Sequence, residues 1–257
     1  MGLISHNSFI DAKKGFTVSF AFVSKAGNRE RNEDSVCALA RDGKYCFAVA
    51  DGLGGHEFGA EASALLTDAV EREFETAFNN HMFIKAVFER AQAEILAKQE
   101  EKNANNHMRT TAVLLSISGK KYAFAHIGDS RLYYFKRLAL AARTEDHSVP
   151  QVLALAGEIT EADIATHPDR ARLLRVLGDK WEKPQYEIAK ERPLRRHTAF
   201  LLCSDGFWEY LPSTNFAPLP GQDANSWLAA LLAKVEQAGQ GSGRDMDDYS
   251  AVAVTVM

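Results

Sequence analysis

Apolar residues in the first part of the chain recur in short runs that are continuous or alternate with polar residues, a pattern typical of β-strands. This pattern predicts strands over Thr17–Val23, Ser35–Ala40 and Tyr45–Ala50. The dipeptide Asp42-Gly43 lies between the last two strands and favours a tight turn. We therefore expect these two strands to form a hairpin.

After the hairpin the apolar positions change to helical spacing. One predicted helix carries its apolar stripe on Phe58, Ala62, Leu65, Ala69, Phe74 and Phe78, and a second on Phe83, Val87, Ala91 and Ile95. A helix with one apolar stripe needs a surface to cover, and a sheet face supplies one. The polar segment Glu100–His107 is expected to be a loop.

The rest of the chain returns to β-rich runs. The segments Thr110–Ser118, Lys120–Ile127 and Ser130–Lys136 predict a meander, and Ala199–Cys203 and Tyr249–Val256 predict two further strands. Between them, 148–175 reads as a surface excursion of short helices and loops, Ser226–Gln237 as a helix and Gly239–Gly243 as a flexible loop. Strands at both ends with helices between them favour one domain over residues 1–257.

Four aspartates lie beside predicted strand ends: Asp51, Asp129, Asp205 and Asp247. Carboxylate oxygens suit hard cations such as Mg²⁺ or Mn²⁺, and a cluster of carboxylates without a cation would repel itself. For Asp51-Gly52 alone, an ordinary turn is the commoner interpretation. The recurrence of acidic strand ends favours a metal site with two cations that activate water and bind the oxygens of a phosphate.

The polar segment Gly27–Asp34 lies between two predicted strands. Taken alone, it is most often a solvated loop. Beside a phosphate site, however, its Arg29 could supply the paired donors that bind phosphoryl oxygens.

The composition of the chain argues against several classes of protein. The net charge of −4 and the lack of a sustained Lys/Arg block argue against a nucleic-acid or membrane-surface protein. No apolar run reaches the roughly 18 residues of a membrane span, and the N-terminus lacks a signal-peptide pattern. Cys37, Cys46 and Cys203 lie in apolar runs and are interpreted as reduced core residues, so a cytoplasmic location is expected. His126 alternates with small apolar residues and is expected to be a hydrogen-bonded core histidine.

Competing enzyme motifs fail at single positions. His56-Glu57 is followed by Ala60 where a zinc protease needs a second histidine, and Leu202 stands where a nucleophile elbow before Ser204 needs glycine. The Gly52–Gly55 segment has neither dinucleotide-binding spacing nor a P-loop lysine. The Asp245–Asp247 segment precedes its strand, which argues against an aspartyl-phosphate nucleophile.

The ordered motifs are Arg29 with RNED, VADGLGGH, RTT, IGDSRLYYF, EDHS, SDGFWE and DDYSAV. Together they resemble the bacterial metal-dependent protein phosphatases of the PPM, or type-2C, family, from about Thr17 to the C-terminus. The resemblance implies an α+β fold: a four-layer αββα β-sandwich of two antiparallel sheets flanked by helix pairs. It also implies hydrolysis of phosphoserine or phosphothreonine by direct attack of metal-activated water, without a phosphoenzyme.

The resemblance further implies site roles. Asp51 would bridge two ions, Mn²⁺ or Mg²⁺, and the Gly52 carbonyl would bind one of them. Asp205 and Asp247 would complete the coordination of the second ion, while Glu33 would hold the waters bound to the first. Asp34 would orient the bridging water and Arg29 would bind the phosphoryl oxygens. Asp129 resembles, together with Asp205, the ligands of a weaker third metal.

Four positions depart from the family pattern. Leu53 stands where eukaryotic members carry a histidine regarded as the general acid, and His56 is too far along the chain to inherit that role. Asp247-Asp248 replaces the usual Asp-Asn, which leaves the ligand ambiguous, although Ser250 favours Asp247. Glu209 stands where an aspartate often assists the third metal, and Arg109 replaces a usual glycine.

Partners follow from the resemblance as well. The residues at about 148–196 correspond to the variable flap, where substrate choice is expected to lie. Phosphorylated proteins and a cognate bacterial Ser/Thr kinase are the expected partners, in some relatives within secretion-system regulation, and a monomer is expected. The alternative is a catalytically weak or inactive relative that serves as a phosphoprotein-binding scaffold. That alternative predicts losses at Asp51, Asp205 or Asp247, and all three carboxylates are present.

Overall fold

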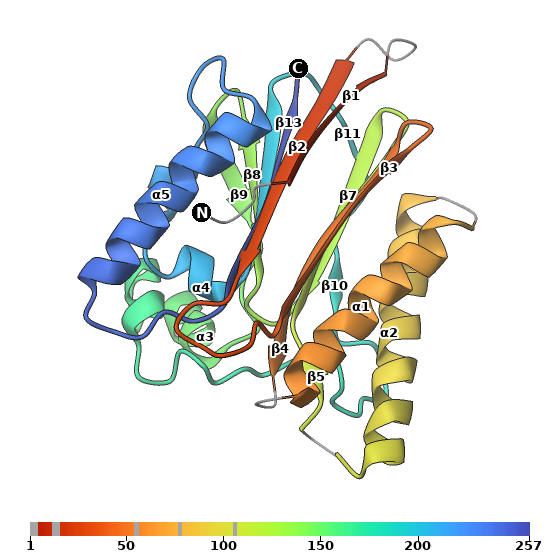
Figure 1. Cartoon of the computed structure of the whole chain (residues 1–257), viewed down its shortest axis with the longest axis vertical. Helices are drawn as coiled ribbons and strands as arrows, with labels where there is room; N and C mark the ends of the chain where they lie inside the picture. The colour runs from red at the N-terminus through yellow and green to blue at the C-terminus, as the bar shows by residue number, and fades with distance from the viewer. Residues whose placement is uncertain (1–4, 12–15, 54–56, 77–78, 105–106) are drawn as a thin grey trace.

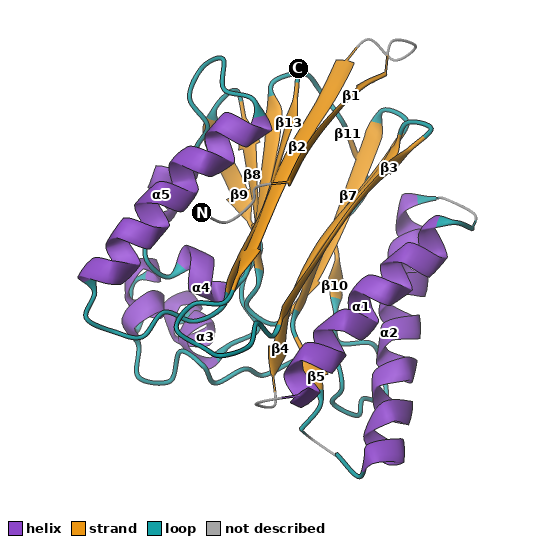
Figure 2. Cartoon of the chain, viewed as in Figure 1, coloured by secondary structure: helices purple, strands orange, loops and turns teal. Residues whose placement is uncertain are grey.

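The computed structural model describes residues 5–11, 16–53, 57–76, 79–104 and 107–257. Two antiparallel sheets face each other, and helices cover their outer faces (Figure 1). The colouring in Figure 2 separates the four layers: helices, sheet, sheet, helices. Gly54, Gly55, His56 and Phe78, which the sequence analysis singled out, lie outside the described residues.

The first sheet has the strand order β1-β2-β13-β12-β8-β9. Its strands are β1 (Ser5–Asp11), β2 (Phe16–Lys25), β8 (Arg131–Lys136), β9 (Ala139–Arg143), β12 (Thr198–Cys203) and β13 (Tyr249–Val256). Because β2 and β13 are neighbours, strands from the two ends of the chain pair along their full length.

The second sheet has the order β10-β7-β6-β4-β3, with β11 also paired to β7 and β5 paired to β4. Its strands are β3 (Asp34–Arg41), β4 (Lys44–Leu53), β5 (Arg109–Thr110), β6 (Ala112–Ser118), β7 (Lys121–Ile127), β10 (Glu187–Ile188) and β11 (Arg192–Pro193). Asp42 and Gly43 both have positive φ, 52° and 72°. Both central residues of a type I′ hairpin turn need a positive φ, so these values confirm the predicted hairpin.

The helical layers differ in build. Helices α1 (Glu57–Phe74) and α2 (Asn80–Lys102) cover the second sheet, as the two apolar stripes predicted. The first sheet is covered by one long helix, α5 (Ala224–Gly241), with the short α4 (Asp205–Trp208) beside it. The remaining helical turns are α3 (Val149–Leu155) and the 3₁₀ helices η1 (Glu161–Thr166) and η2 (Ser213–Phe216).

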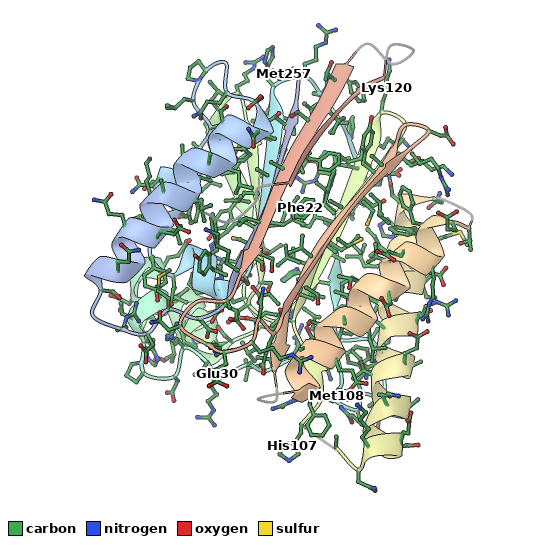
Figure 3. All side chains as sticks on the ribbon, viewed as in Figure 1. Phe22, Glu30, His107, Met108, Lys120 and Met257 are labelled. Atoms are coloured by element: carbon green, nitrogen blue, oxygen red, sulfur yellow. The ribbon has the colours of Figure 1, made fainter. Side chains whose placement is uncertain are left out.

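The core consists of three apolar clusters. One fills the space between the sheets and includes Phe20, Phe47 and Phe200, with Phe22 at its margin (Figure 3). The second lies between the second sheet and α1 and α2, and the third between the first sheet and α5. Three clusters separate four layers, which confirms the expected αββα sandwich.

Three local predictions are wrong at least in part. The loop expected at Glu100–His107 begins later, because α2 runs to Lys102. Strand β8 does not continue a meander, because it pairs with β12 in the first sheet while β6 and β7 pair in the second. The chain changes sheets at Gly128, whose φ is +90°. The loop expected at Gly239–Gly243 is partly helical, since α5 runs to Gly241. Gly239 faces the side chain of Met246, and this tertiary contact favours the helix there.

Residues 148–175 are mostly loop with α3 and η1, as expected of a surface excursion, and the flap that extends to residue 196 is mostly loop as well. Its last part adds β10 and β11 to the outer edge of β7. Among the helices that the structure describes, none has the length and apolar character of a membrane span.

Candidate metal centre and active site

A cavity of about 730 Å³ opens at one end of the sandwich. Figure 3 labels one of its lining residues, Glu30, at the lower edge of the molecule. The lining includes nearly all of the site residues expected from the sequence: Arg29, Glu33, Asp51, Gly52, Asp129, Asp205 and Asp247. Asp34 is not among the lining residues, but it is buried directly opposite Asp51 in the β3–β4 register.

These residues come from both sheets. Arg29 and Glu33 lie in the β2–β3 loop, and Asp51 lies near the end of β4 in the second sheet. Asp205 follows β12 and Asp247 precedes β13, both in the first sheet. The cavity is therefore built where the two sheets meet.

The backbone of Asp51 is fixed by two threonines. The Asp51 amide donates to Thr111 Oγ1 at 3.1 Å, and the Asp51 carbonyl accepts from the Thr111 amide and Thr110 Oγ1, both at 2.9 Å. Both threonines are fully buried. The RTT motif thus holds the strand end that presents the Asp51 carboxylate.

Gly52 is required by close packing and not by a turn. Strand β4 continues through Gly52, which pairs with Thr110 of β5. A side chain at Gly52 would place its Cβ 2.2 Å from the carbonyl oxygen of Gly59 on α1. The Gly52 amide also donates to the Glu33 carbonyl at 3.2 Å. Only glycine allows the three segments to approach so closely.

Arg29 lies across the cavity mouth. Its Nη2 donates to Asp247 Oδ2 at 2.8 Å, and its Nη1 lies 3.6 Å from Asp248 Oδ2 and 3.9 Å from Glu33 Oε2. The side chain is 46% exposed, so part of the guanidinium faces solvent and could bind an anion in the cavity.

Asp34 belongs to a buried chain of hydroxyl groups. Ser204 Oγ donates to Asp34 Oδ2 at 2.8 Å and accepts from the Ser250 amide at 2.9 Å. Both serines are fully buried. Burial is the main cause that raises the pKa of Asp34 to about 7, and its neighbours Asp205 and Asp248 add to it.

The surroundings of three carboxyl groups that line the cavity also raise their pKa values. Burial, followed by the charges of Asp205 and other carboxylates, raises the pKa of Asp51 well above its usual range. Burial and Asp205 do the same for Asp129, and burial and Asp247 raise the pKa of Asp205 to about 6. Asp34 Oδ1 and Asp205 Oδ1 are buried without a hydrogen-bond partner among the described residues. Buried, mutually repelling oxygen ligands fit divalent cations such as Mn²⁺ or Mg²⁺.

Asp247 and Asp248 have different surroundings. Asp247 lines the cavity, whereas Asp248 is 2% exposed and its Oδ2 accepts from the Glu33 amide at 2.8 Å. The geometry therefore favours Asp247 as the candidate ligand and gives Asp248 the task of holding the β2–β3 loop.

Comparison with known proteins decides the family. The family model described as protein phosphatase 2C matches residues 23–248. The serine/threonine phosphatase stp of Listeria monocytogenes is 33% identical over 195 residues, which are 72% of this chain and 76% of the relative. This chain belongs to the protein phosphatase 2C family.

Solved structures agree with this assignment. The serine/threonine phosphatase PstP of Mycobacterium tuberculosis has a TM-score of 0.79 at 27% identity, covering 93% of this chain and 98% of that one. PppA, a key regulatory component of T6SS in Pseudomonas aeruginosa, has a TM-score of 0.78 at 25% identity, covering 98% and 100%. A PstP catalytic domain solved with two manganese ions is 26% identical, with a TM-score of 0.78 and coverage of 94% and 99%.

Glu209, which stands where an aspartate often assists the third metal, has arginine partners in this structure. The Glu209 carboxylate forms an ion pair with Arg170 from the flap, and Arg244 lies 3.8 Å away. Glu209 does not line the cavity, and its side chain is 1% exposed. These contacts leave Asp129 and Asp205 as the candidate ligands of a weaker third cation in this phosphatase.

Sequence reasoning did not assign roles to several residues that support the site. Ser204, Thr110, Thr111 and Trp208 each hold a candidate ligand or Asp34 through a hydrogen bond. The available signal was their place inside the quoted motifs, next to the acidic residues. His126 is buried with Nε2 2.8 Å from the Glu145 carbonyl, as expected of a core histidine.

Proposed function

We propose that this member of the protein phosphatase 2C family hydrolyses phosphoserine and phosphothreonine in phosphorylated proteins, using the cavity at the end of the sandwich. The observation that carries the proposal is that one cavity gathers six candidate acidic or carbonyl ligands from distant segments together with Arg29. Carboxylates suit divalent cations and a guanidinium suits a phosphate, so the cavity combines both requirements.

Two ions, Mn²⁺ or Mg²⁺, would be held by Asp51, the Gly52 carbonyl, Asp205 and Asp247, with Glu33 beside them. Asp129 and Asp205 would hold a third, weaker ion. When bound, the ions supply positive charge and Lewis acidity that brings the pKa of water from about 15.7 toward 7.

The protein's own residues perform the remaining tasks. Arg29 donates N–H groups to the phosphoryl oxygens and orients the ester for attack. Asp34, which is fixed by Ser204, holds the attacking water through one oxygen and accepts its proton.

Leu53 lines the cavity where eukaryotic members have a histidine. This side chain offers no proton, so the leaving serine or threonine oxygen takes its proton from solvent or from another group in the cavity. The absence of a histidine acid predicts that turnover lacks a pKa near 6.5 of the kind a histidine acid would give.

A scaffold without catalysis is the second candidate, and the intact ligand set argues against it. Hydrolysis of p-nitrophenyl phosphate distinguishes the two functions. We expect turnover with Mn²⁺ and none with excess chelator. Turnover that survives chelation would exclude the mechanism, and no turnover under either condition would favour the scaffold.

The wider proposal covers domain organisation and partners. We propose one phosphatase domain over 1–257, with the flap at about 148–196, in a cytoplasmic monomer that opposes a bacterial Ser/Thr kinase. Pairing between β2 and β13 supports one domain, and the similarity to PppA supports a role in secretion-system regulation. Phosphoproteomics of a deletion strain would identify the substrates, and an unchanged phosphoproteome would contradict this role.

A further inference from the structure

The loop of Gly128 and Asp129 is the point where the chain leaves the second sheet for the first. It is tight: Gly128 has φ +90°, and a side chain there would place Cβ 2.6 Å from the Thr111 side chain. Asp129 is 6% exposed and lines the same cavity as Asp205. Any shift of this loop therefore changes the separation of two candidate ligands.

Trp208 holds this loop from one side. Its indole Nε1 donates to the Asp129 carbonyl at 3.0 Å, and the residue is 5% exposed. Trp208 lies on α4, one helical turn after Asp205, and the Glu209 amide closes that turn on the Asp205 carbonyl at 2.9 Å. The indole thus joins the backbone of Asp129 to the helix that begins with Asp205.

The indole is itself held in place. The guanidinium of Arg131 lies 3.3 Å from the centre of the Trp208 ring. Arg131 donates Nε and Nη2 to the two carboxylate oxygens of Asp146, at 2.8 and 2.6 Å, and both residues are buried. A bidentate pair fixes the plane of the guanidinium, and stacking on that plane fixes the indole.

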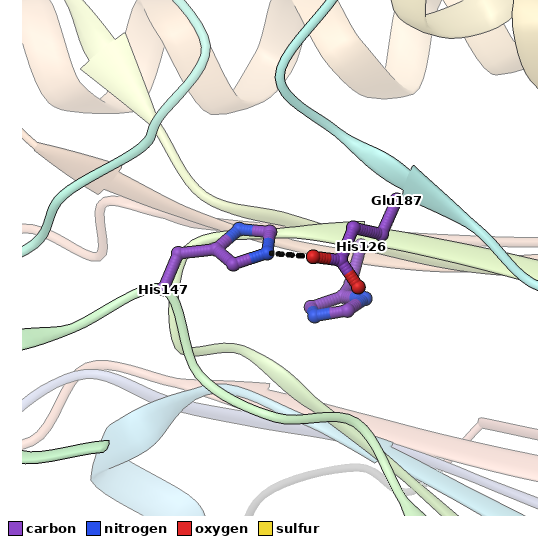
Figure 4. Close-up of side chains that lie close together, drawn as sticks. All are labelled: His126, His147 and Glu187. Atoms are coloured by element: carbon purple, nitrogen blue, oxygen red, sulfur yellow. Dashed lines mark hydrogen bonds and ion pairs between the residues drawn. The ribbon is translucent and has the colours of Figure 1, made fainter. Parts of the chain in front are cut away.

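His147 also holds this loop, and Figure 4 shows its hydrogen bond to Glu187. Its backbone amide donates to the Gly128 carbonyl at 2.9 Å, and its Nδ1 accepts from the Gly128 amide at 3.2 Å. Because Nδ1 accepts, Nε2 carries the proton and donates to Glu187 Oε1 at 3.2 Å. His126 stacks on the imidazole at 4.7 Å between ring centroids.

Ligand atoms of His126, His147 and Glu187 lie within 4.8 Å of one another, a spacing that could suit a cation. Both ring nitrogens of His147 are already engaged, one as acceptor and one as donor. A cation at Nε2 would require a proton at Nδ1, where it would face the Gly128 N–H. The hydrogen bonds therefore indicate that these three residues support the loop and do not form a second metal site.

We infer that Trp208 and His147 are positioning residues that fix the Asp129 carboxylate in the cavity that Asp205 also lines and so set the affinity of this pair for a cation. The inference rests on the proposed function. Partners of this kind, which orient a metal ligand without touching the metal, typically change metal affinity about 10- to 100-fold when removed.

The first test compares two tryptophans. Trp208→Phe keeps an aromatic ring over Arg131 but removes the donor to Asp129. Trp227→Phe is a matched control, because Trp227 is also buried and its indole donates to the Phe216 carbonyl at 2.9 Å, away from the cavity lining. Mn²⁺ binding to the metal-free proteins is measured by titration calorimetry, and the Mn²⁺-induced rise in Tm by thermal unfolding.

We expect Trp208→Phe to weaken the weakest Mn²⁺-binding step about tenfold or more and to reduce the Mn²⁺-induced rise in Tm. Trp227→Phe should lower Tm without Mn²⁺ by a similar amount, yet bind Mn²⁺ as the wild type does. Equal Mn²⁺ affinity in the wild type and both variants, or equal weakening in both variants, would overturn the inference.

The second test uses His147. In His147→Asn, Oδ1 takes the place of Nδ1 as acceptor for the Gly128 amide, whereas His147→Gln offers its polar atoms near Nε2 instead. We expect the Asn variant to retain Mn²⁺ affinity and the Gln variant to lose about as much as Trp208→Phe. Equal affinity of the two variants would count against a positioning role for His147.

The measurements distinguish failure of the proposed function from failure of the inference about Trp208 and His147. A wild-type protein that neither binds Mn²⁺ nor hydrolyses p-nitrophenyl phosphate would refute the proposed function and this inference with it. A wild type that binds and turns over, beside a Trp208→Phe variant with unchanged Mn²⁺ affinity, would refute the inference alone.

Discussion

Arg29 and Asp247 are 218 positions apart in the sequence, yet Arg29 Nη2 donates to Asp247 Oδ2 at 2.8 Å. The candidate phosphate-binding group and a candidate metal ligand are therefore direct partners in the metal-free protein. A cation at Asp247 would compete with the guanidinium for the same carboxylate and leave Arg29 available for a phosphoryl group. If both assignments hold, this pair would couple metal binding to substrate binding.

An Arg29→Ala variant tests whether Arg29 binds the substrate while Asp247 binds the metal. We expect kcat/KM for p-nitrophenyl phosphate to fall about 10- to 100-fold, as for the loss of charge-assisted hydrogen bonds. Mn²⁺ affinity should stay the same or rise, because Asp247 loses a competing partner. Titration calorimetry with Mn²⁺ and steady-state kinetics check both results. Loss of Mn²⁺ affinity with unchanged kcat/KM would reverse the assigned roles.

Asp205 tests the metal assignment directly. Asp205→Asn should abolish metal-dependent turnover and leave the fold intact, because the amide keeps the shape of the side chain but removes the negative charge. Turnover and the far-UV circular dichroism spectrum are the measurements. Asp223→Asn is a suitable control, since Asp223 caps α5 through the Ser226 amide away from the cavity lining. Kinetics of Asp205→Asn equal to those of the wild type would reject the assignment.

The pKa of Asp205, which burial and Asp247 raise to about 6 from 3.8, makes metal-free stability depend on pH. The folded protein binds this proton more tightly than the unfolded chain, so its contribution is present below about pH 4 and is lost as the pH rises past 6. In the presence of chelator, the Tm of Asp205→Asn should therefore equal or lie below that of the wild type at pH 5. At pH 8 it should lie above that of the wild type.

Comparing the variant with the wild type removes an opposing effect. Burial lowers the pKa of His147 to about 4 and also lowers that of His126, so these two groups reduce stability as the pH falls. Both proteins contain these histidines, and their contribution cancels in the difference. A Tm difference that does not change between pH 5 and pH 8 would show that Asp205 carries no raised pKa.

Asp247 and Asp248 are adjacent but should respond differently to substitution. Asp247→Asn removes a candidate ligand, so turnover should fall by at least about 100-fold, the upper range for loss of an outer-shell partner. In Asp248→Asn the amide oxygen can still accept from the Glu33 amide, so most turnover should remain. Kinetics over a range of Mn²⁺ concentrations measure both. The reverse order of effects would make Asp248 the ligand.

Much of the fold could be predicted because its strands bury one or both faces. Tyr45–Ala50 and Ala199–Cys203 are continuously apolar and proved fully buried. Strand β9 was missed because its residues are mostly exposed and show no alternation. Its turn at Arg137 and Leu138 uses positive φ at residues that rarely adopt it, so no turn signal was available.

The pairing of β8 was predicted wrongly for a different reason. Local sequence identifies Arg131–Lys136 as a strand but does not state which sheet it joins, since its partner β12 lies far along the chain. The candidate ligands could be found because acidic residues at strand ends are unusual. Ser204 and Trp208 were given no role, because a serine and a tryptophan in an apolar context look like ordinary core residues and only their place inside the motifs set them apart.

Glu33 and Asp51 belong to the segments around the second sheet, and Asp205 and Asp247 to those around the first. A cation held by Asp51, Asp205 and Asp247 would link two halves that otherwise meet through the apolar cluster between the sheets and through polar contacts such as Ser204–Asp34 and Arg29–Asp247. Catalytic competence then requires the halves to be fully docked, so partial separation of the sandwich should silence the enzyme well before its helices melt.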